Sequence, residues 1–561
     1  MIARMRAALP AIRRSVVLPV TVILLFGLPV ARDLLTAGAF AKVVSPASVP
    51  SVASSQSAAF ELDEATVADL QQAMTTGKYT SRQLVDLYTR RIEEIDRRGP
   101  SLRSVIVVNP DARSIADALD AERKAKGPRG PLHGIPVLIK DNIDTADRMP
   151  TTAGSLALEG SIAVRDAGVV ERLRAAGAVI LGKTNLSEWA NFRSTKSTSG
   201  WSAVGGQVRN PYVLDRNACG SSSGTGTAIA ANLATIGVGT ETDGSIVCPS
   251  SLTGLVGVKP TIGLVSRAGI IPISKTQDTA GPMTRTVADA AALLTVLAGE
   301  DARDAATTRP AAQRARTDYT KALAGASLKG MRIGVPRKRY FGYSPKADAL
   351  IEEALKAMRA QGAVIVDPAD ISTAARLDDC EFEILLYEFK DGLNAYLKAL
   401  GPAARVKSLS DLIAFNQKEA AREMPYFGQE IFEMAQKKGP LTTPAYRQAL
   451  STCRSRSRTL GIDAVMRTHK LDALVAPTVS PAWPTDLVNG DHYLGSSSTP
   501  AAVAGYPSVT VPAGLVNGLP VGISFFGQAW SEAKLLALAY AFEQAAKARQ
   551  PPKFLPTLAD R

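Results

Sequence analysis

The chain has 561 residues, of which 46% are hydrophobic and 21% are charged. This composition excludes a largely disordered protein and allows either one large globular domain or two ordinary ones. The formal net charge is +13, but basic and acidic residues are interleaved, as they are in residues 92–98. Because no basic stripe with interspersed aromatic residues is present, we expect no nucleic-acid partner.

Residues 1–41 are predicted to be a signal peptide or an N-terminal anchor. Four arginines precede the uncharged, apolar segment 15–31, and Ala39-Phe40-Ala41 is typical of a cleavage site. The apolar segment is short for a membrane span and contains two prolines, so that an uncleaved anchor is only an alternative. Residues 42–59 are predicted to be a flexible linker. We therefore expect an exported protein, periplasmic or secreted, with a catalytic domain at 60–561.

Predicted helices and strands alternate through the body of the chain. A helix is expected to begin after Thr80, whose hydroxyl can cap it together with Gln83. The apolar run 105–108 is predicted to be a strand, and a helix at 169–176 precedes another strand at 178–181. Such alternation indicates an α/β fold, in which helices cover the faces of a sheet.

Residues 321–461 are richer in charge, and their apolar residues recur at helical spacing, for example in 382–389 and 409–413. We interpret this segment as a helical insertion or lid over the sheet. The apolar runs 474–477 and 508–512, which follow it, are expected to return to the core as strands.

Two pattern matches fail in their context. Residues 177–184 fit the phosphate-loop pattern, but a helix precedes them and an apolar strand replaces the polar loop, which argues against nucleotide binding. Residues 220–224 fit the nucleophile elbow G-x-S-x-G with Ser222 at its tip, although loop-like residues stand where a strand should lead in. An elbow-type esterase that uses Ser222 and His492 remains the alternative hypothesis.

The four cysteines lie far apart in the sequence and form no cluster with metal-binding spacing. We therefore expect no zinc site, and no motif calls for another cofactor. The pairing and redox state of the cysteines stay open at this point. The residues are Cys219, Cys248, Cys380 and Cys453.

Lys140 could serve as a base for serine catalysis without histidine. A serine hydroxyl near neutral pH must lose its proton to a neighbouring base as it attacks. Lysine acts as a base only when it is neutral, and burial favours the neutral form. Lys140 ends the apolar run 135–139, a predicted strand that would carry it into the interior. Taken alone, Lys140 could equally be a lysine paired with Asp141 at a strand end.

A series of ordered motifs makes the chain resemble the amidase signature family from about Phe60 to the C-terminus. They include GSSSGTG at 220–226 and TDGSIV at 242–247, and further motifs lie at 132–142, 182–188 and 254–261. The resemblance implies a large twisted mixed β-sheet flanked by α-helices. It also implies an amide hydrolase that works through an acyl-enzyme.

The family's catalytic triad carries over to Lys140 as the base, Ser221 as the bridging serine and Ser245 as the nucleophile. Ser221 would relay the proton of Ser245 to Lys140 and later deliver it to the leaving nitrogen. The resemblance further implies an oxyanion hole of backbone N–H groups and two supporting residues. The hole is assigned to Thr242, Asp243, Gly244 and Ser245, and the supporting residues are Thr240 and Ser222.

Departures from the common family pattern point to one branch of the family. Asp243 stands where many members have a glycine, Val247 where they have an arginine, and Cys219 replaces another common glycine. These variants are similar to those of bacterial peptide amidases, which remove the C-terminal amide of peptides as ammonia. Export suits such a substrate and argues against the members that act on charged transfer RNA. Aryl and aliphatic amides remain alternative substrates, and the oligomeric state stays open.

Overall fold

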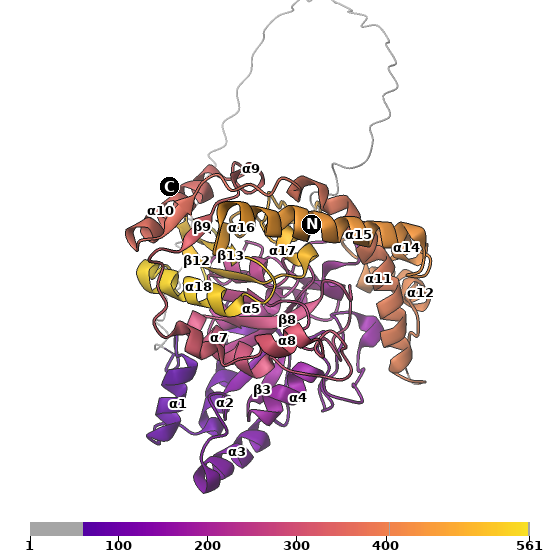
Figure 1. Cartoon of the computed structure of the whole chain (residues 1–561). Coiled ribbons are helices and arrows are strands. Elements are labelled where there is room, and N and C mark those ends of the chain that lie inside the picture. Colours follow the sequence, from indigo (N-terminus) through magenta and orange to yellow (C-terminus); the bar gives the residue numbers. More distant parts are fainter. Residues whose placement is uncertain (1–59, 403, 559–561) are drawn as a thin grey trace, which may run out of the picture.

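The computed structural model describes residues 60–402 and 404–558. An eleven-stranded mixed sheet runs through the molecule, and helices cover both of its faces (Figure 1). This architecture confirms the α/β class and the mixed sheet that the sequence predicts. The signal peptide predicted at 1–41 and the linker predicted at 42–59 lie outside the described residues. In spatial order the strands are β1 (Val105–Val108), β3 (Val179–Thr184), β2 (Pro136–Lys140), β6 (Ile236–Glu241), β8 (Thr279–Thr284), β7 (Val256–Lys259), β12 (Ser508–Val516), β13 (Leu519–Phe526), β11 (Ala473–Pro477), β9 (Arg332–Gly334) and β10 (Val364–Val366).

Strands β3, β2 and β6 form a parallel group within the sheet, with β2 in the middle. Every residue of these three strands is buried. Burial on both faces explains why their sequences are continuous apolar runs rather than alternating patterns. Because β2 and β6 run in the same direction, their carboxyl ends meet at the same edge of the sheet.

Helices pack on both faces of the sheet, as the contacts of β13 show. Helix α18 (Glu532–Ala546) lies on one face, where the rings of Phe542 and Phe525 are 5.9 Å apart. Helix α6 (Val247–Leu252) lies on the other, where Ser251 Oγ accepts a hydrogen bond from the N–H of Gly522 at 2.8 Å. The sheet therefore lies between two layers of helices. Three further helices also pack on it, namely α5 (Ser223–Ala230), α7 (Val287–Leu297) and α10 (Pro345–Ala360).

The N-terminal helices pack around the β1 end of the sheet (Figure 1). The predicted cap at Thr80 is confirmed, because its hydroxyl accepts from the N–H of Gln83 and the Gln83 side chain accepts from its N–H. The helix predicted at 169–176 is shifted by one residue, and Gly177 follows it at φ 76°. These helices are α1 (Val67–Thr75), α2 (Ser81–Arg91), α3 (Ala112–Lys126) and α4 (Gly168–Ala175).

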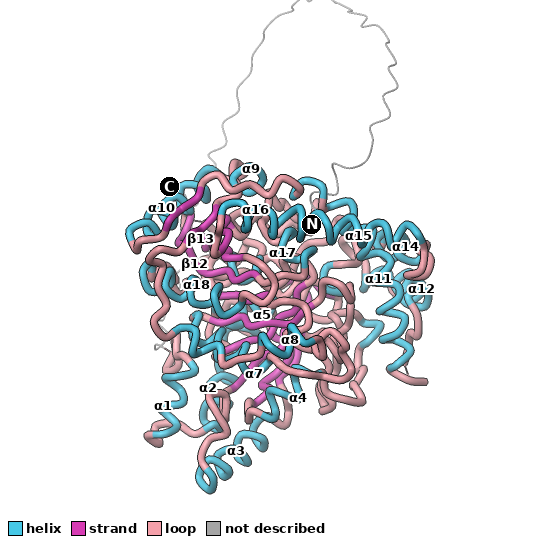
Figure 2. Tube along the Cα trace, in the orientation of Figure 1, coloured by secondary structure: helices cyan, strands magenta, loops and turns pink. Residues whose placement is uncertain are grey.

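The segment 321–461, expected to be a helical insertion, contains strands as well as helices. Strands β9 and β10 pair in parallel and extend the main sheet beyond β11. From Asp378 onward helices gather at one side of the molecule (Figure 2), and several of them contribute to an apolar cluster that includes Trp189, Phe389 and Phe432. These helices are α11 (Asp378–Ala399), α12 (Leu409–Lys418), α13 (Ala420–Glu423), α14 (Glu430–Gln436) and α15 (Pro444–Ser457).

Short elements complete the described chain. They are the hairpin of β4 (Trp201–Ser202) and β5 (Gly206–Gln207), and helices α8 (Pro310–Ala315), α9 (Arg337–Tyr340), α16 (Asp463–His469) and α17 (Thr499–Ala504). Within the described parts of the chain, no helix combines the length and the apolarity that a membrane span requires.

Candidate active site

Lys140 and Thr240 meet at the edge of the sheet because β2 and β6 are parallel neighbours. The Lys140 ammonium nitrogen lies 2.7 Å from Ser221 Oγ, 2.9 Å from Thr240 Oγ1 and 3.3 Å from the Thr240 carbonyl oxygen. Asn142 Nδ2 donates to the same Thr240 hydroxyl at 3.0 Å. The Lys140 side chain is thus held by Thr240 at the end of β6 and by Ser221, which belongs to a segment far away in the sequence.

The electrostatic environment favours a neutral Lys140. Its side chain is fully buried, and burial lowers its pKa from 10.5 to about 7. The nearby carboxylates of Asp278 and Glu241 act in the opposite direction, because they stabilise the ammonium form. At neutral pH a substantial fraction of Lys140 can therefore accept a proton.

Asp278 belongs to this environment as a buried carboxyl group. Burial raises its pKa to about 6, although hydrogen bonds counteract the shift. Thr242 Oγ1 donates to it at 2.6 Å, and the backbone N–H groups of Ile273 and Ser274 donate at 2.8 Å each. Asp278 thereby links the segment after β6 to the loop that precedes β8.

The first serine segment places three consecutive serines before and at the start of α5. The carbonyl of Ser221 accepts from the N–H of Ser187 at 3.0 Å. Ser222 Oγ donates to the Thr240 carbonyl at 3.1 Å and accepts from the Thr240 N–H at 3.3 Å. The Ser222 hydroxyl is therefore committed to the backbone of β6, where it orders the loop.

The second serine segment connects β6 to α6 and carries Ser245. Gly244, directly before it, has a φ of 82°, which a residue with a side chain adopts only with strain. Glu241 Oε2 accepts from the N–H groups of Ile246 and Val247 at 2.8 and 3.0 Å, and so holds the start of α6. The N–H of Ser222 donates to the Ser245 carbonyl at 3.1 Å, which brings the two segments together.

The loop 242–245 also presents backbone donors. Within the described residues, the N–H groups of Asp243, Gly244 and Ser245 donate no hydrogen bond to another protein group. Unpaired N–H groups beside a serine are the kind of donors that stabilise an oxyanion. The geometry is thus compatible with the predicted oxyanion hole, whose assignment remains a prediction.

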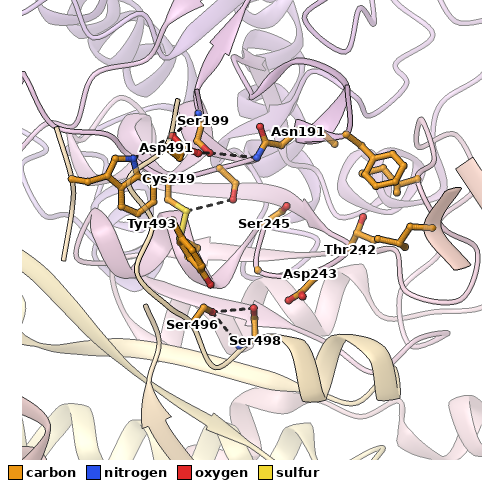
Figure 3. A pocket seen from close by; sticks show the side chains of 18 residues that line it. Asn191, Ser199, Cys219, Thr242, Asp243, Ser245, Asp491, Tyr493, Ser496 and Ser498 are labelled. Carbon is orange, nitrogen blue, oxygen red and sulfur yellow. Dashed lines mark hydrogen bonds between the residues drawn. A yellow bond between two sulfur atoms is a disulfide. The ribbon is translucent and has the colours of Figure 1, made fainter. Parts of the chain in front are cut away.

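A pocket opens onto both serine segments (Figure 3). Ser245 lines it and is 8% exposed, whereas Lys140 and Ser221 are 0% exposed and lie behind the wall. A substrate in the pocket would therefore meet Ser245 first. The remaining lining residues are Ala190, Asn191, Phe192, Ser199, Cys219, Gly220, Thr242, Asp243, Gly244, Cys248, Ile273, Leu385, Trp483, Asp491, Tyr493, Ser496 and Ser498.

The structure gives no support to the alternative hypothesis of an elbow-type esterase, because no hydrogen bond joins Ser222 to His492 among the described residues. His492 is exposed, and its Nε2 lies 2.8 Å from a carboxylate oxygen of Asp486. Ser222 is fully buried, and its hydroxyl bonds to Thr240. The lead-in to α5 is a loop, as expected, so that no strand aims Ser222 at a substrate.

Sequence reasoning did not identify some residues that shape the site. Asp278 and Glu241 carry no motif that marks them, because their roles depend on contacts across the fold. A disulfide joins Cys219 to Cys248, and a second one joins Cys380 to Cys453. Among the described residues, no group of three or more His, Cys, Asp or Glu side chains is arranged to hold a metal ion.

In the described residues a buried lysine is bonded to one serine, and a second serine lines the pocket wall. The family model described as Amidase matches residues 83–536. The chain therefore belongs to the amidase signature family, as its motifs predict.

Individual proteins are similar over most of the chain. A protein named "probable amidase" from Arabidopsis thaliana is 43% identical over 526 residues, which cover 91% of this chain and 97% of that protein. The crystal structure of peptide amidase from Stenotrophomonas maltophilia is 52% identical and covers 88% of this chain and 99% of its own, with a TM-score of 0.83. The crystal structure of an amidase family protein from Bacillus anthracis is 39% identical and covers 87% of this chain and 92% of its own, with a TM-score of 0.79.

Proposed function

We propose that the protein hydrolyses amides with a Ser-Ser-Lys triad, in which Ser245 is the nucleophile, Ser221 the proton relay and Lys140 the base. The observation that carries this assignment is the 2.7 Å contact between Lys140 Nζ and Ser221 Oγ, made by a fully buried lysine whose pKa is lowered to about 7. A lysine held in this way has the basicity that general-base catalysis near neutral pH requires.

The proposed reaction begins at Ser245. Ser245 Oγ attacks the amide carbonyl while its proton passes to Ser221 Oγ, and the Ser221 proton passes to Lys140. The N–H groups of the loop 242–245 stabilise the negative charge that develops on the carbonyl oxygen. The proton then returns through Ser221 to the leaving nitrogen, the C–N bond breaks, and ammonia departs from the acyl-enzyme.

Deacylation uses the same three residues again, with water as the nucleophile. Water takes the place of ammonia and gives its proton through Ser221 to Lys140 as it attacks the ester carbonyl of Ser245. When the tetrahedral intermediate collapses, the proton returns to Ser245 Oγ and the carboxylic acid leaves. No additional catalytic residue is needed for the cycle.

We further propose that the substrates are peptides with a C-terminal amide. The similarity to a peptide amidase supports this choice, and so does the charge of the pocket. Of the described residues that line the pocket, two are the acids Asp243 and Asp491 and none is Lys, Arg or His. Such a wall favours a neutral amide over the carboxylate product, because a carboxylate would meet like charges without a cationic partner.

Ammonia release from a matched panel tests the substrate class. Peptide amides should be hydrolysed with release of ammonia, and the same peptides as free acids should give no ammonia. Aryl anilides, followed by release of the arylamine, should react more slowly. A preference for anilides or short aliphatic amides would instead establish the alternative, a general amidase of the same family. Ser245→Ala should eliminate the hydrolysis of every amide in the panel while the thermal unfolding transition persists, and retained turnover would refute the triad.

We also propose that the protein works outside the cytoplasm. The predicted signal at 1–41 motivates this location, and the two disulfides support it, because disulfides persist mainly in oxidising compartments. Cell fractionation with an antibody against the catalytic domain tests it. Recovery of the protein in the cytoplasmic fraction with its N-terminus intact would contradict the proposal.

A further inference from the structure

The Cys219–Cys248 disulfide connects the two serine segments directly. Cys219 precedes Ser221 by two positions and Cys248 follows Ser245 by three, and the two cysteine Cα atoms are 6.0 Å apart. Both cysteines line the pocket and are 6% and 4% exposed. Cys219 is labelled in Figure 3. The covalent link therefore closes a loop of the chain that contains Ser221 near one end and Ser245 near the other.

The backbone on the Cys219 side depends on an uncommon conformation. Cys219 has a φ of 59°, in the left-handed region that residues other than glycine rarely adopt. Its N–H donates to Asn217 Oδ1 at 2.7 Å and its carbonyl accepts from Ser223 Oγ at 2.6 Å. The chain passes from this residue through Gly220 to Ser221, so that the conformation of Cys219 sets the direction from which Ser221 approaches Lys140.

On the other side, the bond fixes the start of α6. The N–H of Cys248 donates to the carbonyl of Gly244 at 2.8 Å, in the turn that holds Ser245. A movement of Cys248 would therefore be transmitted to Ser245 through one short hydrogen-bonded turn. A hydrogen bond from the N–H of Ser222 to the Ser245 carbonyl joins the same two segments noncovalently.

We propose that the Cys219–Cys248 disulfide is a positioning element of the catalytic site, which holds Ser221 and Ser245 in register, so that its reduction lowers the reactivity of Ser245. This inference rests on the proposed triad and adds a redox dependence to it. A dithiol reductant supplies the two electrons and two protons: the S–S bond breaks, two thiols form, and the dithiol closes to its own disulfide.

The second disulfide provides a matched control in the same chain. It joins Cys380 of α11 to Cys453 of α15, and neither cysteine lines the pocket. Its removal should lower stability, as loss of a disulfide generally does, without acting on the serine segments. A purely stabilising role for Cys219–Cys248 would make the two disulfides equivalent in every assay of the folded enzyme.

The test compares three double variants with the oxidised wild type. Cys219→Ala with Cys248→Ala removes the link, whereas Cys219→Gly with Cys248→Ala removes it but allows the left-handed conformation at position 219. Cys380→Ala with Cys453→Ala is the control. The measured quantities are the rate of Ser245 labelling by a fluorophosphonate probe, and kcat and KM on a peptide amide, at temperatures well below each unfolding transition.

We expect both Cys219 variants to lose at least fivefold in labelling rate and in kcat, and the control to keep both. A Gly variant that loses less than fivefold would overturn the proposal, because the backbone conformation alone would then suffice. Where a variant does not fold, dithiothreitol treatment of native wild type, with thiols counted by alkylation and mass spectrometry, replaces it. Activity that survives conversion of Cys219–Cys248 to thiols would likewise overturn the inference.

The labelling rate separates this inference from the proposed function. If the wild type is labelled at Ser245 but releases ammonia from no peptide amide, the proposed substrate fails and the disulfide inference stands. If ammonia is released and the labelling rate is independent of the disulfide, the inference fails and the proposed function stands. Absence of labelling at Ser245 in active wild type would overturn both.

Discussion

The pH dependence of catalysis is expected to report the protonation of Lys140. Because the base must be neutral, kcat/KM should rise with pH and reach a plateau above the pKa of about 7. For a single titrating group, kcat/KM would be about half of the plateau at pH 7 and about one tenth of it at pH 6. An unperturbed lysine would instead place the midpoint above pH 10, so that the two cases differ by more than three pH units in where activity appears.

The assay is ammonia release from a peptide amide at substrate concentrations far below KM, between pH 6.2 and pH 9. The lower limit matters because burial raises the pKa of Asp278 to about 6, and its protonation would remove a charge that favours the Lys140 ammonium. Asp278→Asn removes the same charge permanently and should move the midpoint to lower pH. A midpoint above pH 9 would refute the proposed role of burial at Lys140, and an upward shift in Asp278→Asn would contradict the effect assigned to the Asp278 charge.

Lys140→Met should abolish turnover and yet stabilise the fold at pH 7. The fall of the Lys140 pKa from 10.5 to about 7 corresponds to a cost of about 4 kcal/mol at pH 7, part of which is offset by lost hydrogen bonds, so that a net gain of about 1–3 kcal/mol is expected. Since the unfolded chain binds the extra proton, the wild type gains stability as pH rises from about 7 to about 10.5, and the advantage of the variant should shrink over that range. Glu241→Ala should cost about 2–4 kcal/mol in a denaturant titration, because it leaves two buried N–H groups without an acceptor, and Glu241→Gln should cost less. Ser222→Ala should lose about 1–2 kcal/mol of stability but keep measurable turnover, and complete inactivation equal to that of Ser245→Ala would contradict its assignment to the loop.

Local patterns predicted the elements that carry the site. The cap at Thr80 and the strands β1 and β3 follow from short-range hydrogen bonding and from apolar runs, and all three are observed, although only Val105 of β1 is buried. The strand that ends at Lys140 could be predicted in the same way, because five consecutive apolar residues are followed by a lysine. Strands β9 and β10, which end the sheet beyond β11, were not predicted, since each has three residues and lies among helices.

The sequence by itself determined the family, the order of the motifs and the presence of a lysine that burial could make neutral. Only the tertiary structure decided which side chains meet. Lys140 and Ser221 are 81 positions apart, and their contact depends on β2 and β6 being parallel neighbours. Tertiary packing likewise decides that Cys219 pairs with Cys248 and that His492 lies at the surface. Propensity and periodicity act over a few residues, whereas the order of strands in a sheet is set by the packing of the whole core.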